Sequence, residues 1–371
     1  METWKKIRLG SACRTNTDSY SPKEKWDFVN YLDTGNITNN TIDSIQFIDL
    51  TKEKLPSRAR RKVRTDSIVY STVRPNQHHF GIIKSQPENF LVSTGFTVID
   101  VDTNVLNADF LYYLLTQNTL VEALHDIAEQ STSAYPSIKT SDIENLEIEI
   151  PDILTQKKIA NILNSLDGKV TQNNEINKNL EQQAQAIYQQ MFIENQNPNW
   201  KEGKLSDLVA VKYGKDHKKL DGGCYPVYGS GGIMRYVEKP LYTGESVLIP
   251  RKGTLNNVMY VNGAFWSVDT MFYTEMLRPN IAKFVYHFVK GKDLASLNAG
   301  SAVPSMTTNI LNAMPLYVPD DETLSIFEET VTPMYSQMQE NEKQSANLAN
   351  IRDTLLPRLM SGELEVSDID L

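Results

Sequence analysis

The chain has 371 residues, 40% hydrophobic and 22% charged, a length and composition that predict a globular protein of two or three domains. No apolar run approaches the roughly 18 residues of a membrane helix, and the opening residues lack a secretory signal, so we expect no membrane contact and a cytoplasmic location. A net charge of −9 disfavours DNA binding, but residues 320 to 371 alone carry −9 and residues 1 to 319 sum to zero, so DNA contact is not excluded.

Residues 1 to 150 have an α+β pattern, in which short β-rich runs such as Ser67–Tyr70 and Phe96–Val101 alternate with turn residues and one helical stretch. Residues 52 to 74 hold eight Lys or Arg against two acids. Such runs contact phosphates, and Arg, Asn and Gln also pair with base edges, although a solvated loop is the alternative for each residue. The candidate DNA-binding residues here are Arg58, Arg60, Arg61, Lys62, Arg64, Arg74, Asn76, Gln77 and His78.

Residues 151 to 198 predict a central spacer helix. Mostly apolar side chains recur there with an unbroken four-three spacing, the pattern of a coiled-coil seam. The alternative is an amphipathic helix packed on its own domain, but about 37 helical residues would reach roughly 55 Å, far beyond what a small domain needs. The predicted seam consists of Ile159, Leu163, Leu166, Val170, Asn173, Asn177, Leu180, Ala184, Ile187 and Met191.

Residues 199 to 318 predict a second α+β domain, with β-rich runs at Ser246–Ile249, Val258–Val261 and Met271–Thr274. Two glycine-containing segments, Tyr225–Gly232 and Ile249–Asn256, have the character of recognition loops, because glycine lets a backbone approach DNA closely. Neither has the spacing of a nucleotide-binding loop. The candidate DNA-binding residues here are Lys212, Lys215, Lys218, Lys219, Tyr228, Ser230, Arg251, Lys252, Thr254 and Asn256, the four lysines facing phosphate.

Residues 319 to 371 predict a C-terminal spacer helix and an acidic tail, which is a solubilising end or, alternatively, a docking surface. We expect Asn173 and Asn341 to meet in an antiparallel pair of helices, where buried polar groups fix register at some cost in stability. Pro333 is expected to kink or restart this helix. The second seam consists of Phe327, Val331, Met334, Met338, Asn341, Ser345, Leu348, Arg352, Leu355 and Leu359.

The chain is an internal repeat. Trp4-Lys5 matches Trp200-Lys201 at an offset of 196 residues, and the offset falls to 168 at two later motifs. These motifs are Ser133 to Ile138 with Ser301 to Met306, and Pro151-Asp152 with Pro319-Asp320. A steadily falling offset indicates longer loops in the first copy. Because Met360 corresponds to Phe192, shortly before Trp200, we expect the C-terminal end to lie close to Trp4.

This arrangement resembles the specificity subunits of type I restriction-modification enzymes over essentially the whole chain. The resemblance rests on the Trp-Lys-x-x-x-Leu opening of each copy, on Ile150-Pro151 with Gln156 to Leu163 and Leu166-Asp167, and on the ending Leu355 to Leu364. It implies two pseudo-twofold-related target-recognition domains, separated by two long helices that form an antiparallel coiled coil. Each domain would read one half of a split target, with half-sites about one helical turn apart. Because the two domain sequences differ, the target is expected to be asymmetric.

The resemblance also implies partners: double-stranded DNA, two modification subunits that bind S-adenosylmethionine and methylate adenine, and restriction subunits driven by ATP with magnesium. No cofactor is expected on this chain. We find no methyltransferase motif, and the two cysteines, Cys13 and Cys224, form no zinc or disulfide pattern. His78-His79 has no acidic or cysteine partner nearby, so we predict no metal site. The alternative functions are a stand-alone DNA-binding regulator and a coiled-coil scaffold that binds only proteins.

Overall fold

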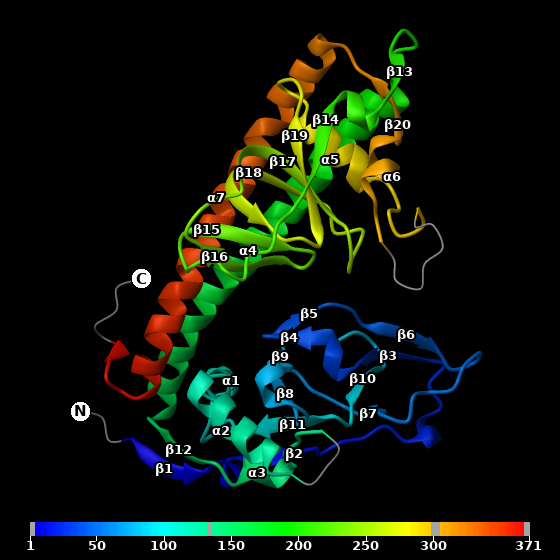
Figure 1. Ribbon diagram of the computed structural model, residues 1–371. Coiled ribbons are helices and arrows are strands. Elements are labelled where there is room, and N and C mark those ends of the chain that lie inside the picture. The colour runs from blue at the N-terminus through cyan, green and yellow to red at the C-terminus, as the bar shows by residue number, and fades with distance from the viewer. Residues whose placement is uncertain (1–3, 132–134, 298–304, 367–371) are drawn as a thin grey trace. The chain divides into compact units, whose positions relative to one another are not determined.

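The computed structural model describes residues 4 to 131, 135 to 297 and 305 to 366 (Figure 1). The chain divides into two compact units: residues 1 to 172 with 344 to 371 form unit 1, and residues 173 to 343 form unit 2. Parts of the repeated Ser-Ala-x-Pro-Ser motif, residues 133, 134 and 301 to 304, lie outside the described residues. No helix of the described segments is both long and apolar enough to cross a membrane.

The α+β domain of unit 1, which the sequence predicts to be a target-recognition domain and which is called the recognition domain below, contains two four-stranded sheets and three α-helices among the described residues. Asn107 caps the first helix, since its side chain accepts a hydrogen bond from the Phe110 amide at 2.9 Å. One sheet has the order β6 (Gln46–Asp49), β3 (Phe28–Leu32), β10 (Phe90–Ser93), β7 (Ala59–Arg61). The other has the order β2 (Cys13–Thr15), β11 (Phe96–Val101), β8 (Ser67–Ser71), β9 (Phe80–Ile83). The remaining elements are the hairpin β4 (Ile37–Thr38) with β5 (Thr41–Ile42), and α1 (Ala108–Leu115), α2 (Asn118–Glu129) and α3 (Thr140–Glu144).

The recognition domain of unit 2 is built on one six-stranded sheet. Its order is β14 (Val209–Tyr213), β19 (Met271–Met276), β17 (Tyr242–Pro250), β18 (Met259–Ser267), β15 (Tyr225–Gly229), β16 (Gly232–Val237). All neighbours are antiparallel except β15 and β18. Helices α5 (Ala282–Lys290) and α6 (Thr308–Asn312) complete the domain. All five predicted β-rich runs of the two domains lie in strands, except that β18 begins one residue after Val258.

A two-stranded antiparallel ribbon closes each recognition domain. In unit 1, β1 (Lys5–Arg8) pairs with β12 (Glu147–Ile150), and in unit 2, β13 (Lys201–Lys204) pairs with β20 (Pro315–Val318). The long helix of the same repeat begins three residues after the ribbon ends. Asp152 caps one of these helices by accepting from the Leu154 amide at 2.8 Å, and Asp320 caps the other by accepting from the Thr323 amide at 2.8 Å.

The two long helices are α4 (Ile153–Tyr188), which continues as a π-helical turn over Gln189–Glu194, and α7 (Asp321–Met360). Within each unit their segments pack against each other in antiparallel directions. In unit 1, Arg352 of α7 contacts Asp167 of α4, while Leu359 shares a core with Ile159. All twenty predicted seam positions are buried or half-buried. The predicted fold class, α+β recognition domains with two long helices in an antiparallel coiled coil, is confirmed.

The polar positions of the seam pair with one another in unit 2. Asn173 donates to the main-chain carbonyl of Asn341 at 3.4 Å, as the sequence predicted. The Asn341 amide donates to Asn177 at 2.8 Å and accepts from Gln337 at 2.8 Å. These bonds satisfy polar groups that would be costly to bury alone.

Pro333 does not restart the second long helix, so this part of the prediction is wrong. Helix α7 runs through Pro333 from Asp321 to Met360. A proline removes one helical hydrogen bond. Here the ring is exposed, whereas its neighbours Val331 and Tyr335 are buried and hold both sides of the helix in the same core.

The end of α7 returns to the start of the chain. Gly362 has a φ of +71°, and a Cβ atom at this residue would lie 2.9 Å from Nε1 of Trp4. The expected proximity of the C-terminal end to Trp4 is therefore confirmed.

Candidate nucleic-acid interface

The basic run of unit 1 divides into exposed and structural residues. Arg58, Arg60 and Arg64 are exposed on and beside the edge strand β7, where they are open to a polyanion. Arg61 is half-buried, and burial lowers the pKa of its guanidinium. Lys62 forms an ion pair with Glu24 at 2.5 Å and lies 5.4 Å from the centre of the Trp26 ring. The structure therefore places Arg61 and Lys62 in the framework of the domain.

The segment from Arg74 to His78 is a strained surface turn. Arg74 and His78 both have left-handed backbones, with φ of 47° and 55°, on either side of a 3₁₀ turn (Pro75–Gln77). Asn76 and Gln77 are exposed, and the Arg74 guanidinium lies 5.3 Å from the centre of the Tyr135 ring. Non-glycine residues in this conformation cost free energy and cluster at functional sites. This turn is thus a candidate reading element.

The two predicted recognition loops of unit 2 lie against each other. Asn257, the residue that follows the second loop, donates to the Ser230 carbonyl of the first at 2.7 Å. A Cβ atom at Gly253, whose φ is +84°, would lie 2.7 Å from the Ser230 hydroxyl, so this contact requires glycine. Arg251 lies 5.4 Å from the centre of the Tyr213 ring, and Lys252 and Thr254 are exposed.

Three of the four candidate lysines of unit 2 lie on an anchored loop, and Lys212 lies in strand β14. Lys215, Lys218 and Lys219 are exposed and form no ion pair within the described parts of the chain, whereas Lys212 has one distant partner, Glu275, at 3.8 Å. The loop backbone is held by Trp266, which donates to the Lys215 carbonyl at 2.8 Å. Free ammonium groups on a fixed loop are suited to contact phosphates.

Two candidate residues of unit 2 have side chains that are engaged within the unit. Tyr228 is half-buried and lines a cavity of about 540 Å³ beside α4 and α7, where burial raises the pKa of its phenol to about 12. Asn256 donates to Asp293 at 3.1 Å and accepts from the Ala295 amide at 3.1 Å. Both side chains are therefore engaged within the domain.

The structure also exposes four large apolar side chains that sequence reasoning missed. Tyr213, Ile233, Met234 and Tyr236 are each at least half exposed on the sheet of unit 2. Apolar residues in a β-rich run predict core, so composition gives no signal for them. The glycines that flank Ser230 were the usable clue, since they predict a hairpin whose outer strand is free.

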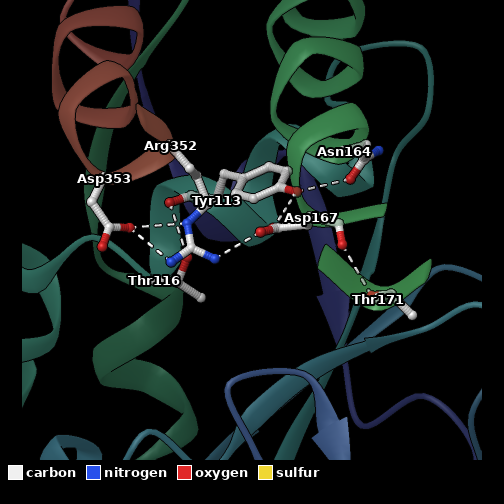
Figure 2. Close-up of polar contacts among 7 residues, drawn as sticks. All are labelled: Tyr113, Thr116, Asn164, Asp167, Thr171, Arg352 and Asp353. Carbon is white, nitrogen blue, oxygen red and sulfur yellow. Dashed lines mark hydrogen bonds and ion pairs between the residues drawn. The ribbon is translucent and has the colours of Figure 1, made fainter. Parts of the chain in front are cut away.

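A polar clasp fastens the recognition domain of unit 1 to both long helices (Figure 2). Tyr113 of α1 is buried and donates to Asp167 of α4 at 2.8 Å. Asp167 in turn accepts from Arg352 of α7 at 2.7 Å. Burial and the Asp167 charge raise the pKa of the Tyr113 phenol, which therefore stays a hydrogen-bond donor.

Unit 2 has the same clasp at repeat-equivalent positions with different residues. His287 of α5 follows Phe284-Val285-Tyr286 as Tyr113 of α1 follows Phe110-Leu111-Tyr112, at an offset of 174 residues. The His287 imidazole is buried and bonds Gln185 of α4 at 2.7 Å and Tyr335 of α7 at 2.9 Å. Burial lowers the pKa of the imidazole to about 4, so it stays neutral. In unit 2 the buried His287 side chain thus contacts both helices directly, whereas in unit 1 Tyr113 contacts α4 and reaches α7 through the ion pair of Asp167 with Arg352. Both arrangements fix the recognition domain on the helices.

The described residues contain no group of His, Cys, Asp and Glu that could hold a metal ion. The ring of His79 faces inward, with Nδ1 2.7 Å from the Ile37 carbonyl.

Comparison with known proteins identifies the kind of chain. The family described as type I restriction modification DNA specificity domain matches residues 1 to 182 and again residues 197 to 347. The HindI specificity subunit of Haemophilus influenzae is 23% identical, with 98% of this chain and all of that protein covered. The MjaIX specificity subunit of Methanocaldococcus jannaschii is 22% identical over 98% of this chain and 94% of that protein. The crystal structure of a type I restriction-modification S subunit from M. genitalium shares the fold, with a TM-score of 0.61, 19% identity and 96% of each chain covered.

Proposed function

This chain belongs to the type I restriction-modification DNA specificity family, and we propose that it reads a two-part asymmetric DNA target and directs adenine methylation and restriction by partner subunits. The observation that supports this most is the repeated clasp. Each unit holds exposed cationic loops on a domain that is fastened to both long helices. A reading surface held rigidly on its scaffold is what sequence discrimination requires.

The asymmetry of the proposed target follows from the two domains. The domain of unit 1 has two four-stranded sheets, and its candidate contact groups are a strained turn and the arginines on and beside β7. The domain of unit 2 has one six-stranded sheet, and its candidate contact groups are two glycine-containing loops and a group of lysines. Different side chains on different frameworks pair with different base edges. The two half-sites should therefore differ.

We propose that this chain contributes recognition and no catalysis. S-adenosylmethionine would be bound by two modification subunits, and ATP with magnesium by restriction subunits. Apart from Thr254, the exposed candidate residues of both units have cationic or amide side chains, which are suited to contact DNA.

The decisive experiment maps methyladenine across the genome in cells with and without this chain. We expect a two-part asymmetric motif that disappears with the gene; an unchanged methylation pattern would refute the proposal. Co-purification with a larger adenine methyltransferase distinguishes it from a stand-alone regulator. Salt-dependent, sequence-selective binding to duplex DNA, with the modification subunits present, distinguishes it from a protein scaffold.

A further inference from the structure

The outer hairpin of unit 2 carries an unusual exposed methionine. β15 and β16 form this hairpin, and β16 is the last strand of the six-stranded sheet (Figure 1). The pairing runs Val227 with Arg235 and then Tyr228 with Ile233, so Met234 has no partner and forms a bulge. A bulge at a sheet edge re-aims a side chain. Met234 is 61% exposed.

Gly229 provides the space for this side chain. A Cβ atom at Gly229 would lie 2.5 Å from the sulfur of Met234, so any other residue here would displace the thioether. The Met234 side chain thus packs over Gly229 on one side and is exposed to solvent on the other. Ile233 beside it is 51% exposed, and the two form an apolar tip on β16, the outer strand of the sheet, whose inner neighbour β15 also pairs with β18.

The surroundings of this apolar tip are cationic. Arg235 donates to the carbonyls of His217 and Leu220, at 2.9 Å and 2.5 Å, and so ties the loop that carries Lys218 and Lys219 to strand β16. The loop also contains Asp216 and Asp221, but three unpaired lysines, Lys215, Lys218 and Lys219, outnumber them. An apolar tip beside unpaired cations fits a polyanion that has an apolar feature inside its groove, and duplex DNA has both properties.

From this geometry we infer that the β15–β16 hairpin enters the major groove and that Met234, with Ile233 beside it, reads the 5-methyl group of a thymine; this rests on the proposed function. Strands can lie in the major groove, β16 is the free outer strand of its sheet, and the thymine methyl is the one apolar base feature of that groove. Neither side chain can donate a hydrogen bond, so these two residues can distinguish bases only by apolar contact, for example with the thymine methyl group.

Deoxyuridine provides the test, because it differs from thymidine only by this methyl group. Using the full chain with its modification subunits and the mapped target, each thymine of the half-site read by unit 2 is replaced in turn. We expect one replacement to weaken binding about four-fold, the loss of one buried methyl. Met234→Gln should bind the thymine and uracil duplexes equally, and Met234→Leu should retain the difference.

The control is Leu277→Gln, an equally exposed apolar residue that follows β19 near the opposite edge of the sheet, which should leave the difference intact. Equal thymine preference in wild type and Met234→Gln, or a half-site without thymine, would overturn the inference while leaving the proposed function in place. If the wild-type complex has no sequence preference at all, the proposed function fails with it. Thermal melting of each variant verifies that it is folded.

Discussion

Asn173 and Asn341 lie against each other in the paired helices of unit 2, where the Asn173 amide donates to the main-chain carbonyl of Asn341 at 3.4 Å. Only 1% of Asn173 and 6% of Asn341 are exposed. Because an asparagine in an apolar seam is best satisfied by another polar group, this pair favours the observed alignment of the helices over shifted ones.

The first prediction concerns this pair. Asn341→Ala should lower the free energy of unfolding by about 1–2 kcal/mol, because Asn177 and Gln337 lose their partner. The double change Asn173→Leu with Asn341→Leu should recover part of this loss, since it adds apolar packing in the seam although Asn177 and Gln337 still lose their partner. Urea and thermal denaturation measure both. A double variant less stable than the single one would contradict this account.

The second prediction concerns the clasp of unit 1. Tyr113→Phe keeps the ring but removes its bond to Asp167, and should cost about 1 kcal/mol of stability. Tyr112→Phe is the matched control, because the Tyr112 hydroxyl has no hydrogen-bond partner among the described residues. Equal losses in the two variants by chemical denaturation would show that the hydroxyl of Tyr113 contributes nothing specific.

The third prediction concerns pH. The folded pKa of His287 is about 4, below the usual 6.5, because the imidazole is buried. The unfolded chain therefore binds the extra proton first, and stability falls as the pH decreases from about 6.5 to about 4. His287→Gln should reduce this fall by up to about 3 kcal/mol. Denaturation at a series of pH values measures it, with His125→Gln, in α2 of the other unit and outside both clasps, as the control. An unchanged pH profile in His287→Gln would be the contrary outcome.

The fourth prediction concerns phosphate contact. Lys218→Ala with Lys219→Ala should weaken binding to all duplexes alike and reduce the slope of log K against log salt by about 2. Lys157→Ala with Lys158→Ala, an exposed pair on α4, removes the same charge and should leave the slope unchanged. Binding titrations at several salt concentrations separate the two. Identical slopes in both variants would remove Lys218 and Lys219 from the interface.

The fifth prediction concerns the chain ends. Gly362 lies against Trp4, so a short linker from the C-terminal end to the N-terminal end, with new termini opened in the exposed segment 194 to 199, should give a permutant that folds and binds the same target. Circular dichroism and DNA binding measure this. Failure to fold with linkers of several lengths would contradict the placement of the ends.

The helices could be predicted from the sequence because a coiled-coil seam is a local period, readable from Ile159 onward without knowing what it faces. The sheets could not, because strand order depends on contacts between distant segments. The same repeat encodes two four-stranded sheets in one unit and one six-stranded sheet in the other. The prediction at Pro333 was wrong because proline interrupts an isolated helix, whereas here the buried residues Val331 and Tyr335 on either side hold the helix together.

Site residues show the same division. Charge identified exposed arginines and lysines, but not that Lys62 is paired with Glu24 or that Tyr228 turns toward the helices. The clasp had a signal in the sequence. In both repeats a residue with a polar group, Tyr113 or His287, directly follows three large apolar or aromatic residues. The Met234 bulge had none, because a bulge is a property of the strand pairing.

The ribbons β1–β12 and β13–β20 hold the two ends of each recognition domain side by side. The chain enters the domain along the first strand of its ribbon and leaves it along the second. A gene segment cut at these two strands would therefore encode a complete cassette. One recombination event could then exchange one such segment for another and change the half-site that is read. The exchange requires that the clasp residue of the new domain still fits the two helices.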